Sequence, residues 1–166
     1  MRGAPSPHYA LAMETFAGLP LHPLVVHFVV VAVPVAALVG IVVSLWPRAR
    51  LALGWFPPLL GLVTLISVPI ATTAGEALFA ALGDPPFVQR HADLGGRLIL
   101  AVGPLFGVLA LQWLLDRPAV YGRLPLSDDA LAWVRRAVAA GVIAAAIASI
   151  WLVILVGDTG TRAVWT

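Results

Sequence analysis

Four long apolar runs without a charged side chain decide what this chain can fold into. A helix needs about 20 predominantly apolar residues to cross the hydrocarbon core of a bilayer, and each run approaches or exceeds that length. None of them shows the period-2 alternation of a membrane β-barrel. Because a bilayer leaves no backbone hydrogen bond to water, helices are the remaining way to span it. The runs cover residues 23–46 (His27 excepted), 55–75, 98–115 and 137–157.

The composition agrees with a single membrane domain. The chain has 166 residues, of which 61% are hydrophobic, so it is too apolar for a soluble domain and too short for two membrane domains. We therefore predict an all-α polytopic membrane protein, a bundle of four transmembrane helices in contact with membrane lipid. An N-terminal tail covers residues 1–20 and the membrane domain residues 21–166, with spans at about 23–46, 55–80, 87–115 and 130–156.

Charge and cysteine content exclude several kinds of site. All ten basic residues are arginine, and a net charge of +2 is too small and too dispersed to indicate nucleic-acid binding. The absence of cysteine excludes disulfides, thiolate metal sites and covalent c-type haem attachment. A metal would have to bind through His, Asp or Glu. No apolar stretch precedes Pro20, so we expect no cleavable signal peptide.

The arginines predict an orientation in the membrane. Loops rich in arginine usually stay in the cytoplasm. Six of the ten arginines lie between spans one and two or between spans three and four, so we expect these loops inside and both termini outside. Four tryptophans near the same loops agree with an interfacial aromatic belt. The six arginines are Arg48, Arg50, Arg117, Arg123, Arg135 and Arg136, and the tryptophans are Trp46, Trp55, Trp113 and Trp133.

The ionisable side chains gather at the other end of the spans. His27 lies about one turn into an otherwise apolar run, and ionisable groups inside a membrane usually find partners and have a function. His22 precedes Pro23, which disfavours the α conformation, so we expect it to be extended. Glu76 follows the second run, His91 precedes the third, and Asp93 and Asp158 lie at the same end.

Two helix starts are marked in the sequence. Asp84-Pro85-Pro86 predicts a start that places His91 one to two turns inside the third helix. At the fourth helix, residues 126–129 predict a start in which Ser127 caps the helix and two aspartates favour its positive end.

Small residues recur on two of the spans. Such stripes let helices approach closely, either within one chain or between copies in a homo-oligomer. The first stripe comprises Ala32, Ala36, Gly40 and Ser44, and the second Gly96, Gly103 and Gly107.

Four short segments carry a family resemblance. L-H-P-L-V-V-H-F, A-T-T-A-G-E-A-L, H-A-D-L-G-G-R-L and G-D-T-G-T-R-A-V-W occur in this order, each at the outer end of a different span. Together they resemble the bacterial membrane family known as domain of unknown function 2231 (DUF2231), over residues 18 to 165. The resemblance implies a four-helix membrane domain, distantly similar to four-helix b-type cytochromes, and brings no assigned reaction. Its motif residues are His22, Pro23, His27, Gly75, Glu76, His91, Gly95 and Gly160.

Three functional classes remain open. In the first, His27 and His91 are axial ligands of a haem b, Gly75 and Gly95 give clearance for the ring, and the protein passes electrons to a redox partner or a larger membrane complex. In the second, His22, His27, His91 and Glu76 bind Zn, Cu or Fe. In the third, the polar cluster of an accessory subunit only ties helix ends together. No nucleophile–base pair or phosphate-binding loop is evident, which argues against a stand-alone enzyme.

Overall fold

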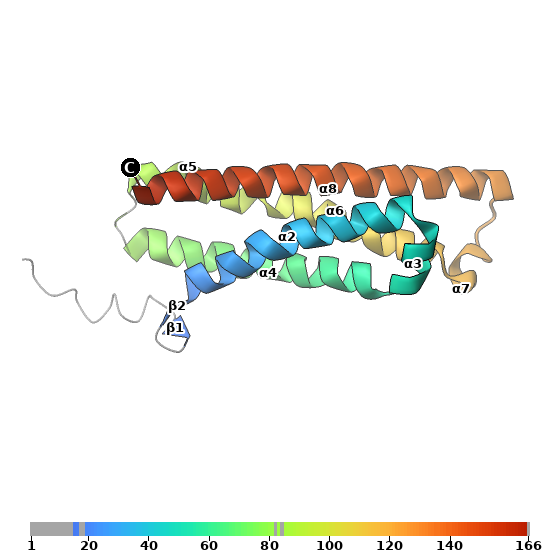
Figure 1. Cartoon of the computed structure of the whole chain (residues 1–166), viewed down its shortest axis with the longest axis horizontal. Coiled ribbons are helices and arrows are strands. Elements are labelled where there is room, and N and C mark those ends of the chain that lie inside the picture. Colours follow the sequence, from blue (N-terminus) through green and yellow to red (C-terminus); the bar gives the residue numbers. More distant parts are fainter. Residues whose placement is uncertain (1–14, 17–18, 82, 84, 166) are drawn as a thin grey trace, which may run out of the picture.

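The computed structural model describes residues 15–16, 19–81, 83 and 85–165, and the side chains of residues 24–80, 83 and 85–162. Long helices lie side by side along one axis, joined by short elements (Figure 1). The long helices are α2 (Leu21–Leu45), α4 (Phe56–Ala81), α5 (Pro86–Arg97) with α6 (Ile99–Leu115), and α8 (Asp128–Trp165). The short ones are α3 (Pro47–Leu53) and α7 (Pro118–Tyr121), and strands β1 (Thr15–Phe16) and β2 (Leu19–Pro20) pair antiparallel.

Four helices of the described chain are long and apolar enough to cross a membrane, which confirms the predicted all-α bundle. They cover Leu24–Leu45, Phe56–Ala80, Pro86–Leu115 and Asp128–Arg162. The third span contains α5 and α6. These helices meet at Leu98, which keeps helical φ and ψ of −58° and −32°, and whose N–H donates to the carbonyl of Gly95 at 3.1 Å. The junction is therefore a local tightening within one span.

The two ends of the bundle differ in chemistry. The beginnings of α2 and α5 lie at the same end as the last turns of α4 and α8, and we call this the histidine end (Figure 1). The opposite end contains α3, α7 and the helix ends that they join, and we call it the arginine end. The sequence prediction that separated histidines from most arginines corresponds to this division.

The first small-residue stripe lies inside the bundle. Ala36 on α2 is fully buried, and a side chain added at Gly40 would meet Val142 of α8 at 3.1 Å and Leu109 of α6 at 3.3 Å. Of the two alternatives left open by the sequence, this stripe therefore follows the first, packing within one chain. A Cβ at any residue of the second stripe, Gly96, Gly103 and Gly107, would meet nothing within 4 Å. That stripe is open on the bundle surface, and its role in a homo-oligomer stays a prediction.

Several polar side chains inside the bundle bond to their own helix or to a neighbouring one. The hydroxyls of Thr64 and Ser149 each donate to the carbonyl four residues earlier at 2.8 Å. Between helices, Nε2 of the buried Gln112 on α6 donates to Oγ of Ser44 on α2 at 3.2 Å. Interhelical bonds of this kind help to hold membrane helices together, because lipid offers no alternative partner.

Both marked helix starts are confirmed. Helix α5 begins at Pro86, and α8 begins at Asp128. The hydroxyl of Ser127 accepts a hydrogen bond from the N–H of Ala130 at 3.2 Å, as an N-cap residue does.

Two other boundaries differ from expectation. His22 lies inside α2, which begins at Leu21, so the predicted extended conformation was wrong. The first N–H groups of a helix have no helical partner, and Pro23 therefore breaks no bond there. Helix α8 continues to Trp165, beyond the expected end at residue 156. The helix continues past Gly157 and Gly160. The hydroxyl of Thr159 donates to carbonyls of the preceding turn, and Arg162 pairs with Asp158 four residues earlier.

We expect Leu105→Ala to destabilise the bundle far more than Leu100→Ala. Both residues lie on α6, but Leu105 is fully buried and Leu100 is 73% exposed. A buried leucine leaves a cavity when it is truncated, with a loss of about 2 kcal/mol or more. The measurement is the free energy of unfolding in detergent micelles. Equal losses for the two variants would contradict the packing described here.

Candidate functional site

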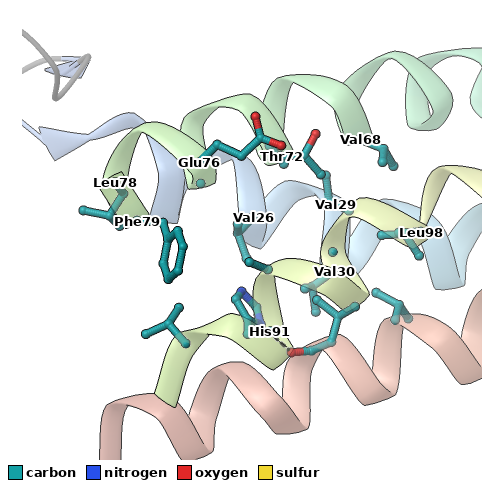
Figure 2. A pocket seen from close by; sticks show the side chains of 17 residues that line it. Val26, Val29, Val30, Val68, Thr72, Glu76, Leu78, Phe79, His91 and Leu98 are labelled. Atoms are coloured by element: carbon teal, nitrogen blue, oxygen red, sulfur yellow. Dashed lines mark hydrogen bonds between the residues drawn. The ribbon is translucent and has the colours of Figure 1, made fainter. Parts of the chain in front are cut away.

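A cavity lies at the histidine end, where α2, α4, α5 and α8 meet (Figure 2). It measures about 110 Å³, and its wall is mostly valine, alanine, leucine and phenylalanine. Its floor is continuous with the apolar core, because Val29, Val68, Leu98 and Val153 belong to both. The side chains that bring polar groups to it are Thr72, Glu76 and His91. The cavity is therefore an apolar space with a few defined polar positions, as ligand sites usually are.

The imidazole of His91 is held in one orientation. Its Nδ1 lies 3.0 Å from the carbonyl oxygen of Val156 on α8. A carbonyl only accepts hydrogen bonds, so Nδ1 carries the proton, and in the neutral ring Nε2 keeps its lone pair. Figure 2 shows the other ring nitrogen on the side away from α8, toward the cavity. His91 therefore presents a lone pair to a largely apolar space.

Gly160 makes this position possible. A Cβ added at Gly160 would lie 3.0 Å from Cε1 and 3.1 Å from Nδ1 of His91. The ring thus rests directly on the backbone of α8, and a larger residue would push it from the Val156 carbonyl. Sequence analysis placed Gly160 in a motif without a role. The sequence holds no signal that separates Gly160 from Gly157 one turn earlier, where a Cβ would meet nothing within 4 Å.

Glu76 and Thr72 approach the cavity from α4. The hydroxyl of Thr72 donates to the carbonyl of Pro69 at 3.0 Å, so it satisfies its own helix. Glu76 is exposed although it lines the cavity. Figure 2 shows its carboxylate along α4 beside Thr72, whereas the His91 ring enters the cavity from α5. The carboxylate is thus at the rim and the imidazole is inside.

The structure brings four predicted site residues together. Gly75, Glu76, His91 and Gly95 all line the cavity, and a Cβ at Gly95 would meet nothing within 4 Å. His27 is exposed and is not among the lining residues, although its neighbour Val26 is. The side chain of His22 falls outside the described part of the chain. The axial pairing of His27 with His91 therefore stays a prediction.

Asp93 and Asp158 are engaged on the surface of this end. Asp93 accepts from Nε2 of Gln89 at 3.1 Å, and Asp158 pairs with Nε of Arg162 at 2.9 Å, both within one helix. Within the described residues, no three His, Asp or Glu side chains are grouped closely enough to hold a metal ion. The predicted metal set of His22, His27, His91 and Glu76 includes one side chain outside that range and so stays a prediction.

A family model described as "Predicted membrane protein (DUF2231)" matches residues 18–166. The chain belongs to this family. No curated protein and no solved structure matches it.

The DUF2231 segments quoted above lie on α2, α4, α5 and α8 at the histidine end. Gly75, Glu76, His91 and Gly95 line the cavity, and Gly160 supports it through His91. Most of the DUF2231 motif residues of this chain therefore line or support one cavity.

We expect Gly160→Ala to release the imidazole of His91, because the new methyl group would overlap the ring. Gly157→Ala is the matched control, since a Cβ there meets nothing within 4 Å. The measurement is ¹⁵N NMR of histidine-labelled protein, with His91 assigned through His91→Gln. The wild type and Gly157→Ala should show the Nδ1–H tautomer, and Gly160→Ala should lose it. An unchanged His91 signal in Gly160→Ala would contradict the contact.

Proposed function

We propose that this integral membrane protein binds a haem b through Nε2 of His91 and acts as an electron-transfer subunit. The observation that supports the proposal is the fixed imidazole, whose Nδ1 is bonded to the Val156 carbonyl while the other nitrogen faces an apolar cavity. Imidazoles that bind metals are commonly oriented by such a bond from the second ring nitrogen. A hydrophobic ring with a central metal suits these surroundings.

The number of available ligands favours haem over a non-haem metal. A porphyrin supplies four nitrogens itself and needs one or two axial groups from the protein. A zinc site needs three or four protein ligands, and the described residues contain no group of three. His91 alone is therefore sufficient as a protein ligand for haem and insufficient for a zinc site.

The cavity must open to admit a porphyrin. Its volume of about 110 Å³ is below the roughly 300–1,000 Å³ of most ligand pockets. Leu78 and Phe79 of α4 and Val88 of α5 line the cavity, and we propose that the two helices separate at these residues on binding. Gly75 and Gly95 line the same space without side chains that would obstruct a ring. Helix α5 packs more extensively against α8 than against α4, so the contact between α4 and α5 is the weaker one at this corner.

We expect protein expressed with added haem to show a Soret band that His91→Gln abolishes. The control His8→Ala, in the predicted N-terminal tail, should leave the band unchanged. His27→Ala tests the second axial ligand. With two histidine ligands, the reduced spectrum would change from low-spin to high-spin in this variant. If His91 is the one histidine ligand, His27→Ala should have the same reduced spectrum as the wild type. The exposed position of His27 favours this result. Protein without a Soret band contradicts the proposal, and one equivalent of bound zinc or copper would assign the site to a non-haem metal.

We also propose that the histidine end faces the outside of a bacterial inner membrane, because six of the ten arginines belong to the opposite end. Reporter fusions after Arg50 and after Val120 should then behave as cytoplasmic, and a fusion after Pro86 as external. A cytoplasmic report after Pro86 would reverse the orientation, and the cavity would then face the cytoplasm.

A further inference from the structure

A second cavity lies at the arginine end, between α3, the beginning of α4 and the end of α6. It measures about 90 Å³, and its lining is much more polar than that of the first cavity. Its charged side chains are Arg50, Asp116 and Arg117, and Trp113 and Gln112 lie beside them. Neither the fold prediction nor the proposed haem site gives these residues a function.

Hydrogen-bond donors outnumber acceptors in this cavity. Nε of Arg50 pairs with Asp116 at 3.1 Å, and within the described residues its other N–H groups make no further bond. The guanidinium of Arg117 lies over the ring of Trp113, with 4.5 Å from Cζ to the ring centre. Nε1 of Trp113 is buried, and no described residue accepts its proton. A buried donor without an acceptor is unfavourable, so the arrangement calls for an acceptor from outside the chain.

We propose that this cavity binds the phosphate group of an anionic phospholipid. The lining carries two guanidinium groups and one carboxylate, so its charge is positive. Arginine binds phosphate oxygens well because its planar N–H groups can donate in pairs. In this proposal the N–H of Trp113, which has no acceptor among the described residues, is a neutral donor to the same phosphate. One phosphate oxyanion would satisfy the donors that the chain itself leaves unused.

The position favours a lipid over free phosphate. The cavity lies at the ends of the spans, where lipid headgroups are found. Trp46, Trp55 and Trp133 are more than 60% exposed at the same end, as in an interfacial belt. Apolar Leu51 and Pro57 also line the cavity, so its wall offers contacts to the apolar part of a lipid as well as to its phosphate. Basic pockets between helix ends are a known way to recognise anionic headgroups.

The test is native mass spectrometry of the full chain in neutral detergent, titrated with phosphatidylglycerol, phosphatidylcholine or inorganic phosphate. We expect one tightly bound phosphatidylglycerol and weaker phosphatidylcholine. Arg117→Gln and Trp113→Phe should each weaken phosphatidylglycerol binding by about five-fold or more, the effect of one arginine or one charged hydrogen bond. Asp116→Asn should strengthen it, because the competing carboxylate is gone, and loss of folding cannot produce this gain.

Matched controls come from the same end of the bundle. Arg136 lies over the ring of Trp133 at 5.1 Å, but neither residue lines the cavity. Arg136→Gln and Trp133→Phe remove the same groups and should leave binding unchanged. Equal binding by all variants, or equal affinity for both lipids, would overturn the proposal. Displacement of the lipid by inorganic phosphate at the same concentration would overturn the lipid assignment. None of these results depends on haem binding.

Discussion

Helix formation within lipid is the constraint on which the rest of this structure depends. No water is available to a backbone carbonyl in the hydrocarbon core, so hydroxyl side chains also return to their own helix. Thr64, Ser149 and Thr159 all donate to carbonyls of the preceding turn. Some carbonyls also accept from a side chain of another helix: that of Leu115 from Arg135, and that of Val156 from His91. The histidine can therefore be fixed in the span only because α8 offers this acceptor.

The second constraint is the close approach between helices at glycine. It contributes to packing in the core and to the candidate site at the histidine end. Gly40 lets α2 meet Val142 of α8 inside the core. Gly160 lets the ring of His91 meet the backbone of α8 at the histidine end. The same absence of a side chain thus gives stability in the first case and orientation of a ligand in the second. A small-residue pattern in the sequence does not distinguish these roles, because both look like ordinary helix packing.

The sequence predicted the helices well because length and hydropathy alone determine a span. It also placed Glu76 and His91 at one end, since neither fits the middle of a membrane. It did not predict that His91 enters the cavity while His27 is exposed outside its lining. That difference depends on how α2 and α5 are rotated against their neighbours. The rotation follows from packing between helices, which the pattern along a single helix does not contain.

The start of α2 was predicted wrongly for a local reason, because a proline is tolerated in the first turn of a helix.

The length of α8 explains why both cavities lie near a membrane surface. Its 38 residues extend over roughly 57 Å at 1.5 Å per residue, well beyond the hydrocarbon core of about 30 Å. The helix therefore projects at its ends, where Val156 holds His91 and where Arg135 donates to the carbonyl of Leu115 at 2.8 Å. Polar groups at these depths meet headgroups and water as well as lipid chains. The imidazole of His91 therefore lies close to one end of the apolar part of α8.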